Sequence, residues 1–226
     1  LYAFKNAEGH WEGLSVDILE RISRMTGLQF VHKESFSTVQ TLDMLSTGEA
    51  QMNTTLSKNE ERKAFLNFTY SYGGAPWAFV VRMQDSRLGS LTQLSGKVLA
   101  LPAQHVLEPM IRREYPEIIL RTVGSFDQAR KLVENGEALA TIQNETQAYL
   151  YPAGQLKVGR SVDGRWSVDN FSVSKPYPEL LDIFNKALEA IPVAEFRALK
   201  TRWLGGVGKP LVIESGLYHS AWLYWA

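Results

Sequence analysis

Three side chains that could bind a carboxylate lie close together in the sequence, at Thr55, Ser57 and Arg62. Residues 52–56 have the pattern of a short strand, on which alternate side chains point the same way, so both hydroxyls would face one side. Ser57 followed by Glu60 is the pattern of a capping box, which predicts that a helix begins at Ser57. Amides at a helix start favour an anion, and arginine can bind a carboxylate through two hydrogen bonds. The pattern predicts a carboxylate site, although a surface helix with a cap and a solvated arginine would show the same residues.

The composition argues against several other kinds of site. The 226 residues are 45% hydrophobic, enough for one or two lobes with cores of their own. The 24 basic and 24 acidic residues cancel, so we expect neither a nucleic-acid nor an anionic-membrane partner. Cysteine is absent and the four histidines are scattered, so we expect no metal and no cofactor. No run of 18 apolar residues occurs, so we expect no membrane-spanning segment.

The hydrophobic pattern predicts helices that alternate with short apolar strands, in two successive rounds. Such alternation is typical of parallel sheets covered by helices, which predicts an α/β chain with two lobes. The expected helices are 14–25, 38–45, 106–115, 125–135, 144–151, 178–191 and 195–204, and the expected strands are 28–32, 52–56, 76–82, 97–101, 118–123, 138–143 and 164–174.

The segment that contains Arg62 resembles a signature of the bacterial periplasmic solute-binding proteins of family 3, the amino-acid type. That signature is Thr-x-Ser/Thr-x-x-x-x-Arg followed by an apolar residue, Phe and Tyr, which are here Thr55, Ser57, Arg62, Leu66, Phe68 and Tyr72. The resemblance covers roughly residues 1–206, and its strongest motifs lie at 13–18, 55–72, 125–144 and 180–205.

The resemblance implies a two-lobed Venus-flytrap fold of type II, in which each lobe is a mostly parallel sheet flanked by helices. Lobe 1 would comprise residues 1–81 with the return helices 173–206, and lobe 2 would comprise 82–172. In this family the two chain crossings form a hinge, and the lobes close around a ligand.

The tail, residues 207–226, departs from the family pattern. A complete family member begins with a central strand before the segment that matches Leu1, and this strand is missing here. The tail contains a strand-like run at 211–214 and then an aromatic segment. It could begin a tandem module, supply the missing strand of lobe 1 in this molecule or a neighbour, or dock as an aromatic tail on the surface.

The resemblance implies that Arg62 binds the α-carboxylate of the ligand and that the hydroxyls of Thr55 and Ser57 assist. Two aromatic side chains, Phe4 and Tyr72, are expected to face the pocket, whereas the other aromatic residues are expected to be core.

The second lobe lacks the residues with which the family binds an α-ammonium group. In the family an Asp after the strand pairs with the ammonium, and here the two Asp positions of this motif hold Leu139 and Asn144. The family's Gly-Thr turn, whose amides and hydroxyl share the carboxylate, is also lost and holds Gln104 and His105. Asn144 can form a neutral hydrogen bond but carries no charge. A standard L-amino acid is therefore disfavoured, and the expected ligand is a small carboxylate, another anion, or none. His105 could be a pocket group that titrates near neutral pH, but an exposed histidine at a helix start is the favoured interpretation.

The family also contains the extracytoplasmic sensor modules of BvgS/EvgS-like histidine kinases, often present in tandem. The altered second lobe and the tail favour such a sensor, in the periplasm, with a small anionic ligand, a membrane-anchored parent chain, and a tandem module or homodimer as further partners. The alternatives are a free binding protein of an ABC transporter and a regulatory domain attached to a cell-wall lytic enzyme. The sequence shows no paired carboxylates on a helix face and no Ser/His/Asp set, so the domain itself is not expected to be an enzyme.

Overall fold

The chain folds into two compact units in the computed structural model, which describes residues 2–86, 88–149, 154–205 and the backbone of 219–225. Unit 1 comprises Leu1–Gly73 and Val168–Ala226, and unit 2 comprises Gly74–Ser167. The chain therefore leaves unit 1 after Gly73 and returns to it at Val168. The boundaries expected from the sequence were 81/82 and 172/173.

Unit 1 is a five-stranded sheet with helices and a small hairpin. The strands follow the order β3-β12-β4-β11-β5, and β1 pairs with β2 separately. Its elements are β1 (Phe4–Lys5), β2 (Trp11–Glu12), α1 (Leu14–Thr26), β3 (Gln29–Ser35), α2 (Thr38–Thr47), β4 (Met52–Asn53), α3 (Glu60–Lys63), β5 (Leu66–Phe68), β11 (Ser172–Ser174), α7 (Pro178–Ala190), α8 (Val193–Leu204) and β12 (His219–Trp225).

The strand β12 comes from the C-terminal tail and lies between β3 and β4, antiparallel to both. Along β3 the pairing extends from His219 opposite Ser35 to Trp225 opposite Gln29. The strand-like run expected at 211–214 lies outside the described residues. The tail thus contributes backbone hydrogen bonds to the interior of this sheet.

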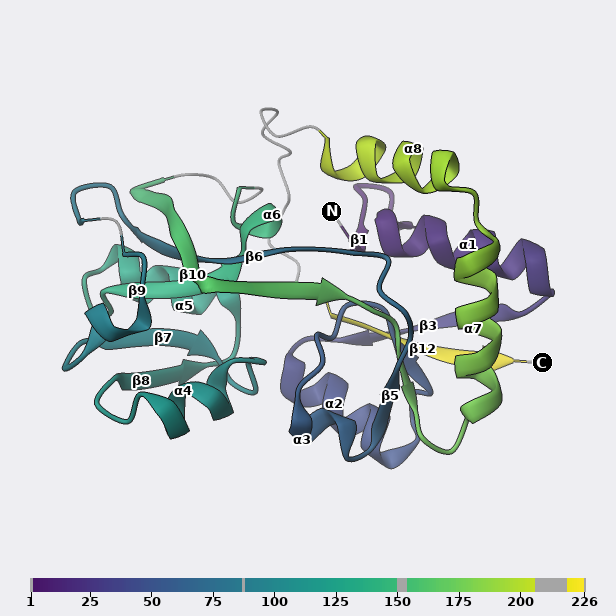
Figure 1. Cartoon of the computed structure of the whole chain (residues 1–226), viewed down its shortest axis with the longest axis horizontal. Helices are drawn as coiled ribbons and strands as arrows, with labels where there is room; N and C mark the ends of the chain where they lie inside the picture. Colours follow the sequence, from purple (N-terminus) through teal and green to yellow (C-terminus); the bar gives the residue numbers. More distant parts are fainter. Residues whose placement is uncertain (1, 87, 150–153, 206–218, 226) are drawn as a thin grey trace. The chain divides into compact units, whose positions relative to one another are not determined.

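The start of α1 explains two residues, Gly13 and Asp17, of the family motif at 13–18. Gly13 has φ 132°, and a Cβ on it would lie 2.3 Å from the carbonyl oxygen of Tyr2, so only glycine fits there. Asp17, one turn later, accepts a hydrogen bond from Trp203 Nε1 at 2.7 Å and pairs with Arg202 at 3.2 Å. These contacts fix α8 on α1, and α1 also packs against α7 (Figure 1).

Unit 2 is a five-stranded sheet of order β10-β6-β9-β7-β8, in which the inner strands β9 and β7 are the most buried. Alternate residues of β7 belong to different hydrophobic clusters, Leu99 and Leu101 to one and Ala100 to the other, as the period of a strand requires. Its elements are β6 (Gly73–Arg82), the 3-10 helix η1 (Leu91–Leu94), β7 (Val98–Pro102), α4 (Glu108–Glu114), β8 (Ile119–Val123), α5 (Phe126–Glu134), β9 (Ala140–Asn144), α6 (Glu145–Ala148) and β10 (Leu156–Asp169).

The predicted α/β class with two lobes is confirmed, but neither sheet is mostly parallel: the sheet of unit 2 is mixed, and neighbouring strands in unit 1 are antiparallel. In unit 2, β7 is parallel to β8 and β9, while β6 is antiparallel to β9. In unit 1, β11 and β12 are antiparallel to their neighbours. The strand β11 is the one on which the chain returns from unit 2, so no crossover within unit 1 sets its direction. The strand β12 follows β11 after α7 and α8, and because both are antiparallel to β4, they are parallel to each other.

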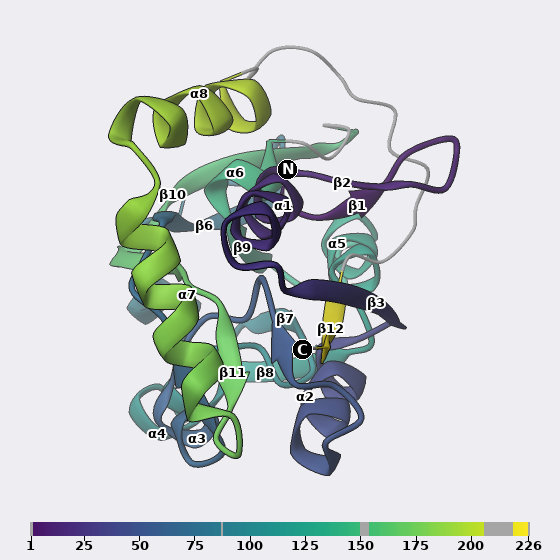
Figure 2. The same cartoon turned by 90° about the vertical axis from the view of Figure 1, so that its right-hand side faces the viewer.

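The segment that returns from unit 2 is joined to the segment that leaves unit 1 by backbone hydrogen bonds. Thr69 N donates to the carbonyl of Phe171 at 2.9 Å, and Tyr72 N donates to the carbonyl of Asp169 at 3.0 Å. The α7 helix packs along β11 (Figure 2), and its Asn185 Oδ1 accepts from Tyr70 N at 2.8 Å. The segment that leads out of unit 1 is therefore fixed by two backbone carbonyls and the Asn185 side chain of the segment that returns.

Candidate functional site

A turn that follows β4 carries the hydroxyl residues predicted to assist ligand binding. The fully buried side chain of Asn53 accepts from Thr55 N at 2.7 Å and from Leu56 N at 2.9 Å. Its Oδ1 also lies 3.4 Å from Thr55 Oγ1. An asparagine that bonds to amides two and three residues later fixes an irregular backbone. Sequence reasoning missed Asn53, and its position directly after a short strand was the signal that could have found it.

The prediction that Ser57 caps a helix is wrong. The helix α3 spans only Glu60–Lys63, and its N-cap is Asn59, which accepts from Arg62 N at 2.9 Å. Asn59 is as good a cap as serine, and its bond to Arg62 N places the helix start after it. Because α3 is a single turn, its dipole adds little to anion binding, and a receptor here depends on the guanidinium.

The guanidinium of Arg62 is buried, with only 5% of the residue exposed. Its Nη1 donates to the carbonyl oxygen of Ser57 at 2.5 Å. Removal from water lowers the pKa of Arg62 to about 10, and the nearby Glu61 opposes this decrease. The side chain is still charged at neutral pH. The structure thus brings Arg62 and Ser57 together as predicted, but through the serine carbonyl rather than its hydroxyl.

Tyr72 is committed to the interior of unit 1 by its hydroxyl. That hydroxyl donates to the carbonyl of Thr54 at 2.8 Å and lies 3.2 Å from Ser15 Oγ. Its ring lies against Phe171, with centroids 5.0 Å apart. Burial raises the pKa of Tyr72, and the charge of Asp169 raises it further. The phenol therefore stays neutral and supports the backbone beside the Thr54–Ser57 segment.

Phe4, the other aromatic residue predicted to face the pocket, is 9% exposed on β1. Its ring packs edge-on against Trp203 of α8, with centroids 5.8 Å apart. The contact joins the N-terminal hairpin to α8 within unit 1.

In unit 2 the turn after β7 contains a residue in a backbone conformation that glycine usually adopts, although the residue is Gln104. Gln104 has φ 63°, in the left-handed region that non-glycine residues rarely adopt. The backbone amide of Gln104 donates to Glu108 Oε2 at 2.9 Å, and Arg112 binds the other carboxylate oxygen of Glu108 at 2.8 Å. A carboxylate of the protein itself therefore occupies this backbone donor.

His105 is buried rather than exposed, so the favoured interpretation of a solvated helix-start histidine is wrong. It is 4% exposed, and its ring packs edge-on against Trp77 and Phe126 at 4.8 and 5.9 Å. Nδ1 accepts from Leu107 N at 3.2 Å, which requires that Nδ1 carry no proton. Sequence reasoning missed the burial because the two aromatic partners come from distant segments.

Asn144 ends β9 and caps the short α6 by accepting from Thr146 N at 3.0 Å. Next to it, Gln143 is fully buried and its Oε1 accepts from Arg130 Nη1 of α5 at 2.8 Å. Arg130 is 6% exposed, so unit 2 has a buried arginine of its own that sequence reasoning missed. Its position on the inward face of an amphipathic helix was the available signal.

The described parts of both units contain no group of three or more His, Cys, Asp or Glu side chains that could hold a metal ion. Within the same residues, no helix has both the length and the apolar character to cross a membrane.

The chain belongs to the bacterial extracellular solute-binding proteins, family 3, whose profile matches residues 1–206. The predicted resemblance is thereby confirmed, and so is the extracytoplasmic location that the family implies.

Two curated relatives are sensor proteins. The virulence sensor protein BvgS of Bordetella pertussis is 28% identical over 202 residues, which are 88% of this chain and 16% of BvgS. The sensor protein EvgS of Escherichia coli K12 is 27% identical over 212 residues, 90% of this chain and 17% of EvgS. The chain thus spans less than a fifth of the relatives that it matches.

Solved structures agree with the assignment of the chain to the solute-binding fold. The periplasmic VFT2 domain of Bordetella pertussis BvgS superposes with a TM-score of 0.77 at 26% identity, over 89% of this chain and 88% of that domain. A mutant of ArgBP from T. maritima superposes with a TM-score of 0.78 at 20% identity, over 90% of each chain, and this likeness shows the fold alone.

Proposed function

We propose that this chain is a periplasmic sensor module of a two-component histidine kinase and that it binds a small carboxylate or another anion through Arg62. The family membership and the likeness to BvgS and EvgS support the sensor role. The kinase and the membrane anchor would lie in parts of the parent protein beyond this sequence.

The observation that carries the ligand proposal is the buried guanidinium of Arg62 beside the irregular segment that contains Thr55 and Ser57. Keeping a cation out of water costs free energy, as the lowered pKa indicates. Such a cost is often retained where a charge must meet a ligand, and arginine is suited to a carboxylate because its donors form a planar fork. Thr55 and Ser57 lie on the adjoining segment, and Asn53 and Tyr72 hold its backbone.

The groups of unit 2 support a ligand without an α-ammonium group. Asn144 caps α6 and offers no negative charge for an ammonium group. The backbone amide of Gln104 is already bound to the carboxylate of Glu108, so anion binding would depend on Arg62. His105 accepts a backbone hydrogen bond at Nδ1. We therefore expect an ordinary L-amino acid to bind poorly, and a simple carboxylate or an inorganic anion to bind better.

Native mass spectrometry of the purified protein tests the proposal, followed by thermal-shift measurements with carboxylates, inorganic anions and amino acids. Three proteins are compared: wild type, Arg62→Met, and Lys63→Met as a control from the same short helix, because Lys63 is exposed and pairs only with Glu60 among the described residues. A bound anion, or stabilisation by added anions, should occur in wild type and in Lys63→Met but not in Arg62→Met.

Strong stabilisation by ordinary amino acids would contradict the proposed ligand class. Equal behaviour of wild type and Arg62→Met toward every anion would show that Arg62 is a structural residue. In the parent kinase, Arg62→Met should change signalling only if wild type binds an anion that Arg62→Met does not bind.

A further inference from the structure

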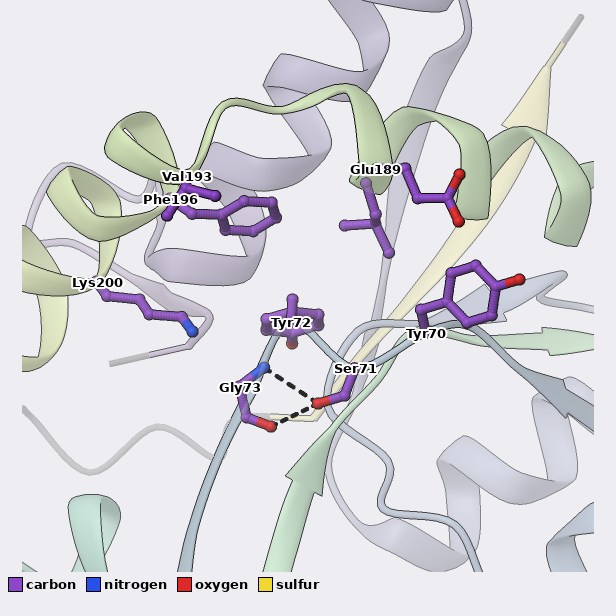
Figure 3. A pocket seen from close by; sticks show the side chains of 9 residues that line it. Tyr70, Ser71, Tyr72, Gly73, Glu189, Val193, Phe196 and Lys200 are labelled. Atoms are coloured by element: carbon purple, nitrogen blue, oxygen red, sulfur yellow. Dashed lines mark hydrogen bonds between the residues drawn. The ribbon is translucent and has the colours of Figure 1, made fainter.

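Unit 1 contains a pocket that none of Thr55, Ser57 and Arg62 lines. It has a volume of about 380 Å³, within the range of small-molecule sites, and lies between residues 70–73, the end of α7, and α8 (Figure 3). We infer that this pocket is a second binding site, for a small monocarboxylate with an apolar body, and that Lys200 is its counter-charge.

The walls of the pocket are apolar. Leu188 is 7% exposed, and the partly buried Phe196 packs against the same hydrophobic cluster. Tyr72 presents its ring, because its hydroxyl is bonded to Thr54 and Ser15 inside the unit. A ring or a branched chain would be removed from water here, which is the main source of favourable free energy for an apolar ligand.

The backbone beside the pocket offers no spare donor at three of its four residues. Tyr70 N bonds to Asn185, Tyr72 N bonds to the carbonyl of Asp169, and Gly73 N bonds to Ser71 Oγ at 3.2 Å, which also donates to Gly73 O at 2.7 Å (Figure 3). Apart from the Ser71 amide, polar recognition must therefore come from side chains.

Lys200 is the side chain suited to that role. Among the residues that the structure describes, its ammonium group forms no hydrogen bond and no direct ion pair. Figure 3 shows the side chain reaching from α8 toward Gly73. A Cβ built on Gly73 would lie 3.5 Å from Lys200 Nζ and 2.9 Å from Asp169 Oδ2, so the two charges flank the glycine. Asp169 does not line the pocket, and a ligand there meets the cation.

The other charged side chain that lines the pocket, Glu189, disfavours a ligand with two carboxylates. Glu189 lies on the opposite side of the pocket from Lys200 (Figure 3). Its carboxylate would repel a second negative group at the far end of a ligand. The arrangement therefore favours a monocarboxylate over a dicarboxylate. Because Gly73 is the last residue of unit 1 before the chain enters unit 2, an occupant would also restrain the segment that connects them.

Calorimetric titration of the whole chain with phenylacetate tests the inference, with phenylacetamide as the uncharged analogue and phenylsuccinate as the dicarboxylate. Phenylacetate should bind, and each analogue should bind at least about fivefold more weakly, as loss of a charge-assisted contact or addition of a repelled charge predicts. Amide chemical shifts should move at residues 70–73.

Two variants should weaken phenylacetate binding by different means. Lys200→Met removes the charge and should weaken it about tenfold, whereas Lys186→Met removes an exposed lysine of α7 that pairs with Asp182 and should leave it unchanged. Val193→Trp fills the pocket at a residue that is 74% exposed, so the fold should tolerate it, and it should abolish binding.

A third variant should have the opposite effect. Glu189→Gln should strengthen phenylacetate binding about twofold by removing a repulsion between two carboxylates.

Equal affinity for phenylacetate and phenylacetamide, or full affinity in Val193→Trp, would overturn the inference. Arg62→Met separates it from the proposed function, because that variant should lose anion binding at the first site and keep phenylacetate binding at the second. If phenylacetate binding is lost in Arg62→Met and kept in Lys200→Met, the ligand uses the first site and the second site does not exist.

Discussion

A buried arginine is present in each unit, and the two arginines have different surroundings. In unit 1, Arg62 donates to a backbone carbonyl of the irregular segment that Asn53 shapes. In unit 2, Arg130 donates to the side chain of Gln143, a fully buried neutral amide within the sheet. Burial of a guanidinium alone therefore does not identify a binding site. What distinguishes Arg62 is that it adjoins an irregular turn, where the proposed ligand would meet backbone and hydroxyl groups, whereas Arg130 bonds across the contact between a helix and a strand.

Substitution of each arginine by methionine gives the largest expected difference. Arg62→Met should weaken anion binding by about 100-fold, the value of two charge-assisted hydrogen bonds. Arg130→Met should leave binding unchanged but lower the free energy of unfolding by about 2 kcal/mol, because the buried Gln143 side chain loses its partner. Calorimetry and urea denaturation measure the two quantities. If both variants lose binding equally, the distinction between the units is wrong.

The two asparagines that end strands provide the next test. Asn53 accepts from two amides and is fully buried, whereas Asn144 accepts from one amide at a helix start. Asn53→Ala should therefore cost about 2 kcal/mol of stability, and Asn144→Ala about 1 kcal/mol. Urea denaturation checks the order. A larger loss for Asn144→Ala would mean that the turn after β4 is held mainly by other contacts.

Asp169 gives unit 1 a pH dependence that can be isolated. Burial raises the pKa of this carboxyl from 3.8 to about 6, although a hydrogen bond from Tyr2 and the charge of Lys200 oppose the increase. The folded state thus keeps a proton that the unfolded state releases between about pH 4 and 6, so Asp169 makes stability fall as pH rises through this window. Asp169→Asn should remove this loss and gain about 1–2 kcal/mol at pH 7.

The comparison of wild type with Asp169→Asn is needed because His32 acts in the opposite direction. Burial lowers the pKa of His32 to about 4, with a contribution from Lys5, so His32 makes stability rise between about pH 4 and 6.5. Subtracting the two stability curves cancels His32. A flat difference between pH 4 and 7 would show that Asp169 is not perturbed.

The smallest expected effect concerns the turn after β7 in unit 2. Gln104 adopts a left-handed backbone, and Gln104→Gly should relieve that strain and raise stability by about 0.5–1 kcal/mol, less the entropy that glycine adds to the unfolded chain. Gln104→Ala is the control, because it keeps the strain and should gain nothing. Denaturant midpoints distinguish the variants. A loss of stability in Gln104→Gly would show that the side chain itself holds the turn.

Much of the fold could be predicted because local patterns determine it. The helix expected at 14–25 is α1 (Leu14–Thr26), and the one expected at 178–191 is α7 (Pro178–Ala190), because both have a continuous apolar face that dominates any other preference. The helix start expected at Ser57 failed because serine and asparagine compete as caps, and Asn59, two residues later, is the one that caps α3. Weak local signals are decided by contacts that the local sequence does not contain.

The candidate site divides in the same way. The residue types around Arg62 were sufficient to predict a carboxylate receptor, and the family profile supports the segment as a whole. Neither could show that the Tyr72 hydroxyl turns inward to Thr54 and Ser15, or that His105 is enclosed by Trp77 and Phe126. These partners are far from one another along the chain.

By itself, the sequence determined the α/β class, the two lobes, the lack of net charge and the residues with which an anion could be bound. Only the tertiary structure decided which of those residues are enclosed, which amides the protein's own carboxylates already occupy, and that Lys200 stands beside an apolar pocket. The physical reason is that periodicity and capping act over a few residues, whereas burial and charge compensation depend on which distant segments meet.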